Sequence, residues 1–194
     1  VVGLGGVGSF AAEFLARAGI GTMIIADGDV VDITNINRQL PALHSTIGQH
    51  KAEMVGDRLM DINPELKLTK INEFLEPERM EELIKSEKFD YVLDCIDSLT
   101  PKLTLIKTCR RHKIKLVSSM GAGGKSDPSK VMVRDLQKTN NCLLAKQVRK
   151  RLKKEGITKG FRCVFSTELQ DENSLKLTDG SNFKKSFYGT ISFI

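Results

Sequence analysis

The sequence lacks three features that would point to particular classes of protein. Its 194 residues contain no apolar run close to the ~20 residues that a membrane-spanning helix needs. The four cysteines, Cys95, Cys109, Cys142 and Cys163, are far apart and include no C-x-x-C pair. A structural zinc built from paired cysteines is therefore not expected. Widely spaced single cysteines are typical of a reducing compartment, and we expect a cytoplasmic protein.

The sequence also lacks an excess of acidic residues. Lys and Arg total 30 against 24 Asp and Glu, which gives a net charge of +6. An excess of this size is compatible with a nucleic-acid partner without establishing one. Positive charge is concentrated in residues 107–115 and 146–154, and few aromatic residues lie between the cations. Contact with an RNA phosphate backbone is therefore favoured over base stacking, and a solvated helix face is the alternative for each segment.

Predicted strands and helices alternate through the first 120 residues. Short apolar or β-branched runs predict strands at 1–4, 22–27, 67–74, 90–97 and 114–119. Apolar periodicity and end signals predict helices at 9–18, 51–62, 77–85 and 101–112. In the first helix we expect Phe10, Phe14 and Leu15 to face the core. This alternation predicts a Rossmann-like, doubly wound, mostly parallel sheet.

The pattern changes after residue 120. Strict alternation predicts an antiparallel strand at 129–136, a basic helix follows at 142–156, and another strand is predicted at 162–166. Leu143, Leu144, Val148 and Leu152 are expected to anchor the helix. Residues 171–185 are predicted to form a mobile loop. We expect one domain over 1–194, with a nucleotide-binding part (1–120) and a substrate-side part (121–194), trimmed at both ends from a longer protein.

A glycine-rich turn opens the chain. Gly3, Gly5 and Gly8 form G-x-G-x-x-G, with Gly6 inside it, between a predicted strand and a predicted helix. Such a turn brings phosphate close to backbone N–H groups at a helix N-terminus. Asp27 ends the next strand, where an acid can accept hydrogen bonds from ribose hydroxyls. A turn without a ligand is the alternative.

Residues downstream of Asp27 favour ATP over a dinucleotide. Asn35, Arg38 and Gln39 follow the second strand, and Lys51 starts a helix. A nicotinamide dehydrogenase has no need for a fixed Arg and Asn here, whereas an enzyme that splits a triphosphate does. Arg38 can bind phosphate oxygens through two N–H groups, Asn35 can bind ribose or phosphate, and Lys51 supplies a second cation.

Two acidic residues and one cysteine complete the candidate set. Asp97 follows the fourth strand, where a carboxylate can hold Mg²⁺ against phosphate; capping the next helix is the alternative. Asp94 is expected to face elsewhere and to pair structurally. Cys163 lies in a strand-like run, where a small buried residue is the common interpretation and an acyl-carrying thiol is the alternative.

Separated motifs occur here in the order typical of one family. "GLGGVGS", Asp27, "TNINRQ", "GQHKAE", "INP" and "DCIDS" resemble the ThiF/MoeB-type adenylating enzymes, which share the fold of ubiquitin-activating enzymes. The segment from "DCIDS" through "GAGGKSDPSKVMVRDLQKT", with "CVFSTE", resembles the tRNA threonylcarbamoyladenosine dehydratase branch. Many relatives outside that branch carry zinc on C-x-x-C pairs, which this sequence lacks.

The resemblance implies a mechanism and partners. ATP would adenylate a carboxylate, pyrophosphate would leave, and a nucleophile would attack the acyl-adenylate. Arg38 and Lys51 would neutralise the phosphates, and Mg²⁺ on Asp97 would orient the leaving group. The carboxylate would belong to threonylcarbamoyladenosine in a tRNA anticodon loop, which would cyclise with net loss of water. Relatives are homodimers, so a homodimer is expected.

Other functions use part of the same motif set. An activator of a ubiquitin-like or sulfur-carrier protein tail would share the adenylation site and would usually need a groove and a thioester cysteine. A nicotinamide or flavin oxidoreductase would use the glycine turn alone. A catalytically silent scaffold is disfavoured because Arg38, Lys51 and Asp97 are all present.

Overall fold

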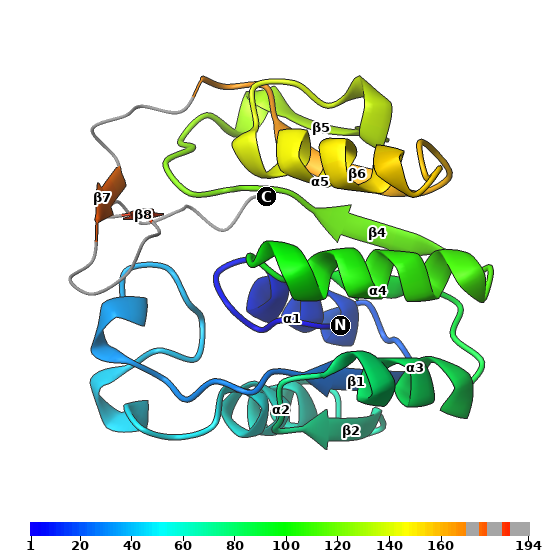
Figure 1. The fold of residues 1–194 in the computed structure, drawn as a ribbon. Helices are drawn as coiled ribbons and strands as arrows, with labels where there is room; N and C mark the ends of the chain where they lie inside the picture. The colour runs from blue at the N-terminus through cyan, green and yellow to red at the C-terminus, as the bar shows by residue number, and fades with distance from the viewer. Residues whose placement is uncertain (170–174, 178–183, 187–194) are drawn as a thin grey trace.

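The computed structural model describes residues 1–169, 175–177 and 184–186. Helices and strands alternate through most of this range (Figure 1). The helices are α1 (Gly8–Arg17), α2 (Lys51–Ile62), α3 (Pro77–Ser86), α4 (Leu99–Arg111) and α5 (Leu143–Lys154). The strands are β1 (Thr22–Ala26), β2 (Lys67–Ile71), β3 (Val92–Asp94), β4 (Leu116–Ser119), β5 (Val131–Asp135), β6 (Arg162–Ser166), β7 (Leu175–Leu177) and β8 (Lys184–Ser186).

The main sheet consists of two ladders joined at Val2. β1 pairs with β2 in parallel, and the second ladder has the order β3-β4-β6-β5. Val2 makes parallel bridges to Ala26 and to Asp94, so it lies between β1 and β3. Among the described strands of this sheet, only β5 runs antiparallel, with Val131 opposite Ser166. The predicted mostly parallel sheet with an antiparallel addition is therefore confirmed.

Helices cover both faces of this sheet because the strands alternate their side chains. In β1, Met23 and Ile25 belong to the core beneath α1 and α2, whereas Ala26 belongs to the core beneath α3, α4 and α5. The second core is the larger and extends to Val148 of α5. The carboxyl ends of the parallel strands meet at one edge, which we call the carboxyl edge.

The predicted apolar stripe of α1 was only partly correct: Leu15 packs against the core, but Phe14 does not. Its buried residues include Ser9, Ala12 and Ala16, whereas Phe14 is 59% exposed. Small side chains at this spacing let the helix lie close to the sheet, next to the fully buried Leu4 and Ile25. Large side chains at the same positions would hold the helix away from the glycine turn.

Two predictions in the second half also need correction. Leu143 does not anchor α5, because it is 68% exposed; Ala145, Val148 and Leu152 form the buried face instead. Residues 171–185, predicted to be a loop, contain β7, which pairs antiparallel with β8. Lys184 and Lys185 belong to β8, and residues 171–174 and 178–183 of that predicted loop lie outside the described residues. In the described part of the chain, no helix is long and apolar enough to span a membrane.

Candidate active site

The glycine turn has the tight geometry that its sequence predicts. Gly3 has φ +86°, and a Cβ there would come within 2.9 Å of the Cys95 carbonyl oxygen. A Cβ on Gly8 would lie 1.8 Å from the Gly3 carbonyl oxygen. Among the described residues, no side chain caps the N-terminus of α1. Backbone N–H groups at this turn are therefore available to an anion.

Asp27 connects the end of β1 to the turn. Its Oδ2 accepts a hydrogen bond from the Leu4 amide at 2.6 Å, and its Oδ1 accepts one from the Asp29 amide at 2.8 Å. Burial raises the pKa of Asp27, and these two hydrogen bonds together with Lys51 partly offset the rise. Each carboxylate oxygen can accept a second hydrogen bond, so Asp27 can still bind a ribose hydroxyl.

Arg38 and Asn35 come from the short helical turn after β1. Arg38 is half-buried, and its Nη1 donates to the Thr34 carbonyl at 3.0 Å and to Asn37 Oδ1 at 2.9 Å. A Cβ on Gly6 would lie 3.3 Å from Arg38 Cγ, so this side chain borders the turn. Asn35 is buried, and its Oδ1 accepts from the Asp32 amide at 3.1 Å. Asn35 therefore stabilises the start of its own helical turn, a role that was not predicted alongside its contact with ribose or phosphate.

Gln39 also borders the glycine turn. Its Nε2 would be 3.6 Å from a Cβ on Gly5. Its Oε1 is buried and has no hydrogen-bond partner among the described residues. A buried acceptor without a donor is costly unless a ligand or water supplies one. This atom fits a bound molecule that carries hydroxyl or amino groups, as ATP does.

Lys51 is buried and forms an ion pair that the sequence analysis missed. Its Nζ lies 2.9 Å from Asp29 Oδ2, and the Lys51 side chain is 5% exposed against 54% for Asp29. The Lys51 amide also donates to the Asp29 carbonyl at 3.0 Å. The available signal was the motif "DGD", in which a second aspartate, Asp29, follows two residues after Asp27.

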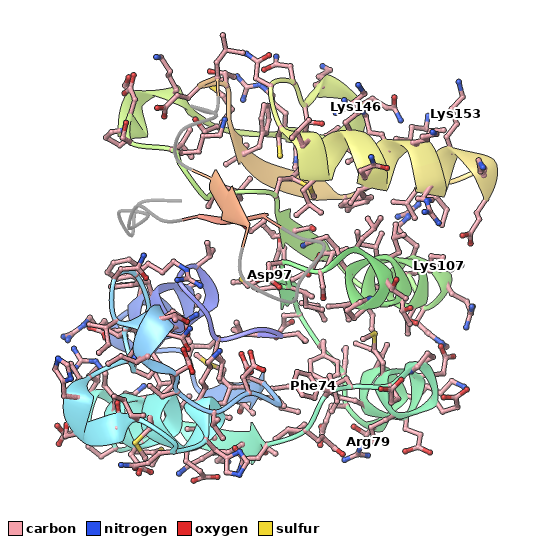
Figure 2. The ribbon with its side chains drawn as sticks, turned by 60° about the vertical axis from the view of Figure 1, so that its left-hand side comes forward. Phe74, Arg79, Asp97, Lys107, Lys146 and Lys153 are labelled. Atoms are coloured by element: carbon pink, nitrogen blue, oxygen red, sulfur yellow. The ribbon has the colours of Figure 1, made fainter. Side chains whose placement is uncertain are left out.

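Asp97 is exposed at the carboxyl edge of the sheet (Figure 2). It does not cap α4, because Ser98 occupies the N-cap position and no side chain in the described part of the chain makes a capping hydrogen bond there. Among the described residues, no group of three or more His, Cys, Asp or Glu side chains could hold a metal by itself. Mg²⁺ is commonly held by one or two carboxylates together with substrate phosphates, so a single exposed Asp fits it.

Asp94 pairs structurally, as predicted. Its side chain is fully buried and lies 2.8 Å from Nζ of Lys102, which is also fully buried. The sequence analysis did not identify Lys102. A lysine eight residues after a strand-end aspartate, in the first turn of a helix, was the only available signal.

The cysteines do not resemble reactive thiols. Cys163 is fully buried in β6, and burial raises its pKa to about 12. Burial likewise raises the pKa of Cys95 to about 11. Since the thiolate is the nucleophile, neither residue is prepared to carry an acyl group. The interpretation of Cys163 as a small buried residue agrees with this geometry.

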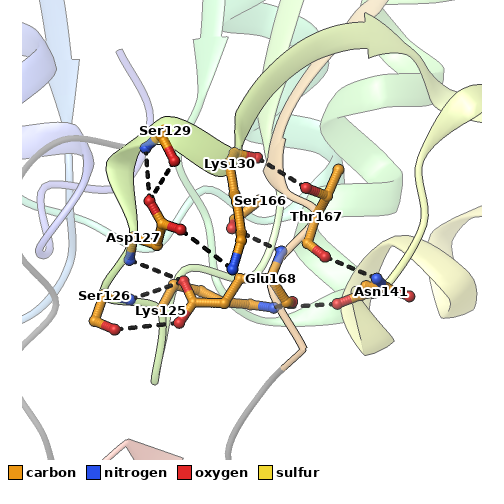
Figure 3. A network of polar contacts seen from close by, with 9 residues as sticks. All are labelled: Lys125, Ser126, Asp127, Ser129, Lys130, Asn141, Ser166, Thr167 and Glu168. Carbon is orange, nitrogen blue, oxygen red and sulfur yellow. Dashed lines mark hydrogen bonds and ion pairs between the residues drawn. The ribbon is translucent and has the colours of Figure 1, made fainter.

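A polar network centred on Lys125 and Glu168 was not singled out from the sequence (Figure 3). Lys125 is buried and donates to the backbone carbonyls of Asn141, at 3.2 Å, and Glu168. The Glu168 carboxylate accepts from the amides of Ser126, at 2.9 Å, and Asp127, at 3.0 Å. These bonds join the loop after β4 to the loop after β6, both at the carboxyl edge.

The two basic segments lie side by side. α4 packs against α5, and Lys107 pairs with Glu155 at 3.2 Å. Figure 2 shows Lys146 and Lys153 on α5 and Lys107 on the neighbouring α4. Arg149, in contrast, is half-buried and donates to the Thr139 carbonyl at 2.7 Å. The predicted cationic face of α5 is therefore built mainly by its lysines.

Comparison with known proteins identifies the family. The sequence pattern of the ThiF family matches residues 1–191. The chain belongs to the ThiF family. This ThiF-family chain is 47% identical over 168 residues to the tRNA threonylcarbamoyladenosine dehydratase of Bacillus subtilis (strain 168), covering 87% of this chain and 66% of that protein. The Escherichia coli (strain K12) protein of the same name is 47% identical over 175 residues, covering 87% of this chain and 65% of that protein.

A solved structure supports the same family at the level of the fold. The E. coli tRNA N6-threonylcarbamoyladenosine dehydratase in complex with ATP matches this ThiF-family chain with a TM-score of 0.84 and 46% identity. The match covers 88% of this chain and 73% of that one. The chain spans about two thirds of the length of the two curated relatives.

Proposed function

We propose that this chain catalyses ATP-dependent adenylation of a carboxylate and thereby the cyclisation of threonylcarbamoyladenosine in tRNA. The observation that carries the proposal is the arrangement of the glycine turn, Asp27, Arg38 and Lys51 around one edge of the sheet. The relatives supply the substrate class, because proteins 47% identical to this chain are named as dehydratases of that nucleoside.

The residues divide into two groups by the part of ATP that they would bind. The turn and the N-terminus of α1 would receive the phosphates, and Asp27 would hold the ribose. Phe74 is 66% exposed, and a Cβ on Gly28 would come within 2.6 Å of its ring Cγ. Its ring thus lies beside the residue that follows Asp27, where it would contact the adenine base.

The chemistry follows from charge. The substrate carboxylate attacks the α-phosphate, the acyl–phosphate bond forms, and pyrophosphate leaves with the electrons of the broken bond. Arg38 and Lys51 stabilise the negative charge that redistributes over the phosphates. Mg²⁺, when bound, screens the same charge, and Asp97 is the residue that would hold it. An internal nucleophile then displaces AMP, which carries away one carboxylate oxygen, so the nucleoside loses water overall.

ATP–pyrophosphate exchange tests the proposal. We expect exchange when the protein is supplied with tRNA that contains threonylcarbamoyladenosine, and none with tRNA that lacks the modification. Exchange that depends instead on the C-terminal tail of a ubiquitin-like or sulfur-carrier protein would favour the alternative function. Sedimentation of the same preparation would test the homodimer, which is a second part of the proposal.

A further inference from the structure

A buried charged network that the proposed chemistry does not use lies directly beneath the carboxyl edge. The side chains of Asp94, Lys102 and Ser118 are all fully buried. The Lys102 ammonium donates to Asp94 Oδ2 at 2.8 Å, to Ser118 Oγ at 3.3 Å and to the Ser119 carbonyl at 2.8 Å. Ser118 Oγ donates to Asp94 Oδ2 at 2.5 Å. All three donors of the ammonium therefore have acceptors, which a buried lysine requires.

The network connects both ends of the segment that contains Asp97. Asp94 is the last residue of β3, Lys102 lies in the first turn of α4, and Asp97 lies between them. Asp94 also accepts a hydrogen bond from the Ile96 amide at 3.1 Å through its second oxygen. The ion pair thus closes a short loop and fixes its backbone from inside. Among the described residues, no hydrogen bond or ion pair holds the Asp97 side chain itself, so its position depends on this backbone.

The same loop supports the glycine turn. The Cys95 amide donates to the Val2 carbonyl at 2.9 Å. A Cβ on Gly8 would lie 3.0 Å from Cys95 Cβ, so the start of α1 packs against the loop that the ion pair closes. Movement of that loop would shift Asp97 relative to the phosphates that the turn receives.

We propose that Lys102 is a positioning residue for Asp97, and this inference rests on the proposed function. Replacing a buried ion pair with apolar residues of similar volume is often neutral or stabilising, so stability alone does not account for the network. The network is accounted for if it holds the exposed Asp97 carboxylate at a fixed distance from the glycine turn. Misplacing a catalytic group by about 1 Å can cost ~10²-fold in rate.

The test uses a variant in which the whole network is apolar: Asp94→Leu, Lys102→Met and Ser118→Ala together. We expect a melting temperature and an ATP affinity close to those of the wild type, measured by calorimetry. We expect kcat for ATP–pyrophosphate exchange with threonylcarbamoyladenosine-containing tRNA to fall ~10²-fold. A matched control replaces the Glu13–Arg58 pair, in which Arg58 Nε lies 2.6 Å from Glu13 Oε2 between α1 and α2. Glu13→Leu with Arg58→Met should leave kcat unchanged.

A second measurement separates positioning from general damage. In an Asp97→Ala background, the three apolar changes should cause no further fall in kcat, because both sets of changes act through the same carboxylate. If the three apolar changes lowered kcat further in the Asp97→Ala background, the inference would be overturned. Full activity of the folded apolar variant would overturn it as well.

The mildest variant keeps the inference testable if the apolar variant does not fold. Ser118→Ala removes one acceptor from the ammonium and one donor to Asp94, so we expect a smaller fall in kcat with ATP affinity retained. Wild-type kcat in Ser118→Ala would then overturn the inference. A wild-type protein without exchange on any substrate would overturn the proposed function itself, which distinguishes the two failures.

Discussion

At the scale of single residues, Asp27 has two roles that one substitution would remove together. Its carboxylate accepts the amides of Leu4 and Asp29 and faces the position expected for the ribose. We expect Asp27→Ala to weaken ATP binding strongly, because both the turn and the ribose contact lose their acceptor. Isothermal titration of ATP and NAD measures this. Unchanged ATP affinity, or tighter binding of NAD than of ATP to the wild type, would show that the site is misassigned.

The charged residues around the turn should act on the transition state more than on ATP binding. Single changes of Arg38, Lys51 and Asp97 to alanine should each lower kcat by ~10²-fold or more, the usual scale for one stabilising group. Steady-state exchange kinetics, together with ATP titration, would separate the two effects. Asp29→Asn is a useful control for Lys51, because it removes the partner and leaves the cation. A variant with near-normal turnover would remove that residue from the catalytic set.

Phe74 offers a direct optical test of the adenine position, because the sequence contains no tryptophan. In Phe74→Trp the single indole should change its fluorescence when ATP binds beside Gly28. Phe74→Ala should weaken ATP binding by up to about tenfold, the scale of one aromatic contact. Tyr91→Trp is the matched control, since Tyr91 is 56% exposed and precedes β3 at the opposite edge. Equal responses from both tryptophans, or none from either, would contradict this placement.

At the scale of elements, α3 and the end of α4 are joined by a pH-sensitive contact. His112 Nε2 lies 2.5 Å from Glu81 Oε1, and this hydrogen bond lowers the pKa of Glu81 from 4.5 to about 2. A carboxyl whose pKa is lowered by folding contributes stability above its unfolded value. That contribution should therefore be present above pH 4.5 and lost as the pH falls toward 2.

Urea unfolding of the wild type and Glu81→Gln over this pH range measures the contact. The difference in unfolding free energy between the two proteins should be largest at neutral pH and should shrink below about pH 4.5. A difference that stays constant with pH would mean that the substitution acts through packing and not through charge.

The lysines of α5 should bind RNA phosphate if the substrate is tRNA. Lys146→Glu with Lys153→Glu should weaken tRNA binding and flatten its salt dependence, because fewer counterions are released. Arg149 is left unchanged, since it donates to the Thr139 carbonyl and its loss would disturb the local structure. ATP binding should not change, because the nucleotide site lies at the glycine turn.

A control carries a single Lys→Glu change on another surface, which is half the change of charge of the α5 variant. Lys67→Glu, at the exposed start of β2, should leave tRNA affinity and its salt slope nearly unchanged. Equal affinity of the α5 variant and the wild type at both low and moderate salt would show that α5 is a solvated surface. A parallel loss of ATP affinity would show that the fold had been damaged and would contradict a specific role for these lysines.

At the scale of the whole molecule, the sequence was sufficient for the order of elements and for several of their bounds. Residues 51–62 and 162–166 form α2 and β6 as predicted, because each has a clear period and clear end signals. The predicted strand at 90–97 is shorter in the structure, since only residues 92–94 pair with β4. The pattern of apolar residues indicates which residues are buried. The ends of a strand depend also on where the neighbouring strands end, which the pattern does not show.

The candidate site was predictable in its residue types but not in its contacts. Gly3, Gly8 and Asp27 occur at spacings that point to one turn, and the structure brings them together. The pairing of Lys51 with Asp29 and of Lys102 with Asp94 depends on side chains that meet only after folding. Lysine patterns in a sequence do not distinguish a buried, paired ammonium from a solvated one.

The place of Val2 in the sheet also determines the order in which the fold can be completed. Val2 bonds to Leu93 and Cys95 on one side, and Gly3 bonds to Ala26 on the other. The βαβ unit formed by the first strand, α1 and β1 can form locally. Val2 lacks its hydrogen-bond partners on the β3 side until the chain has been synthesised through Cys95. Nucleation in the first third of the sequence therefore cannot finish the glycine turn, and the turn matures only when a distant strand docks beside it.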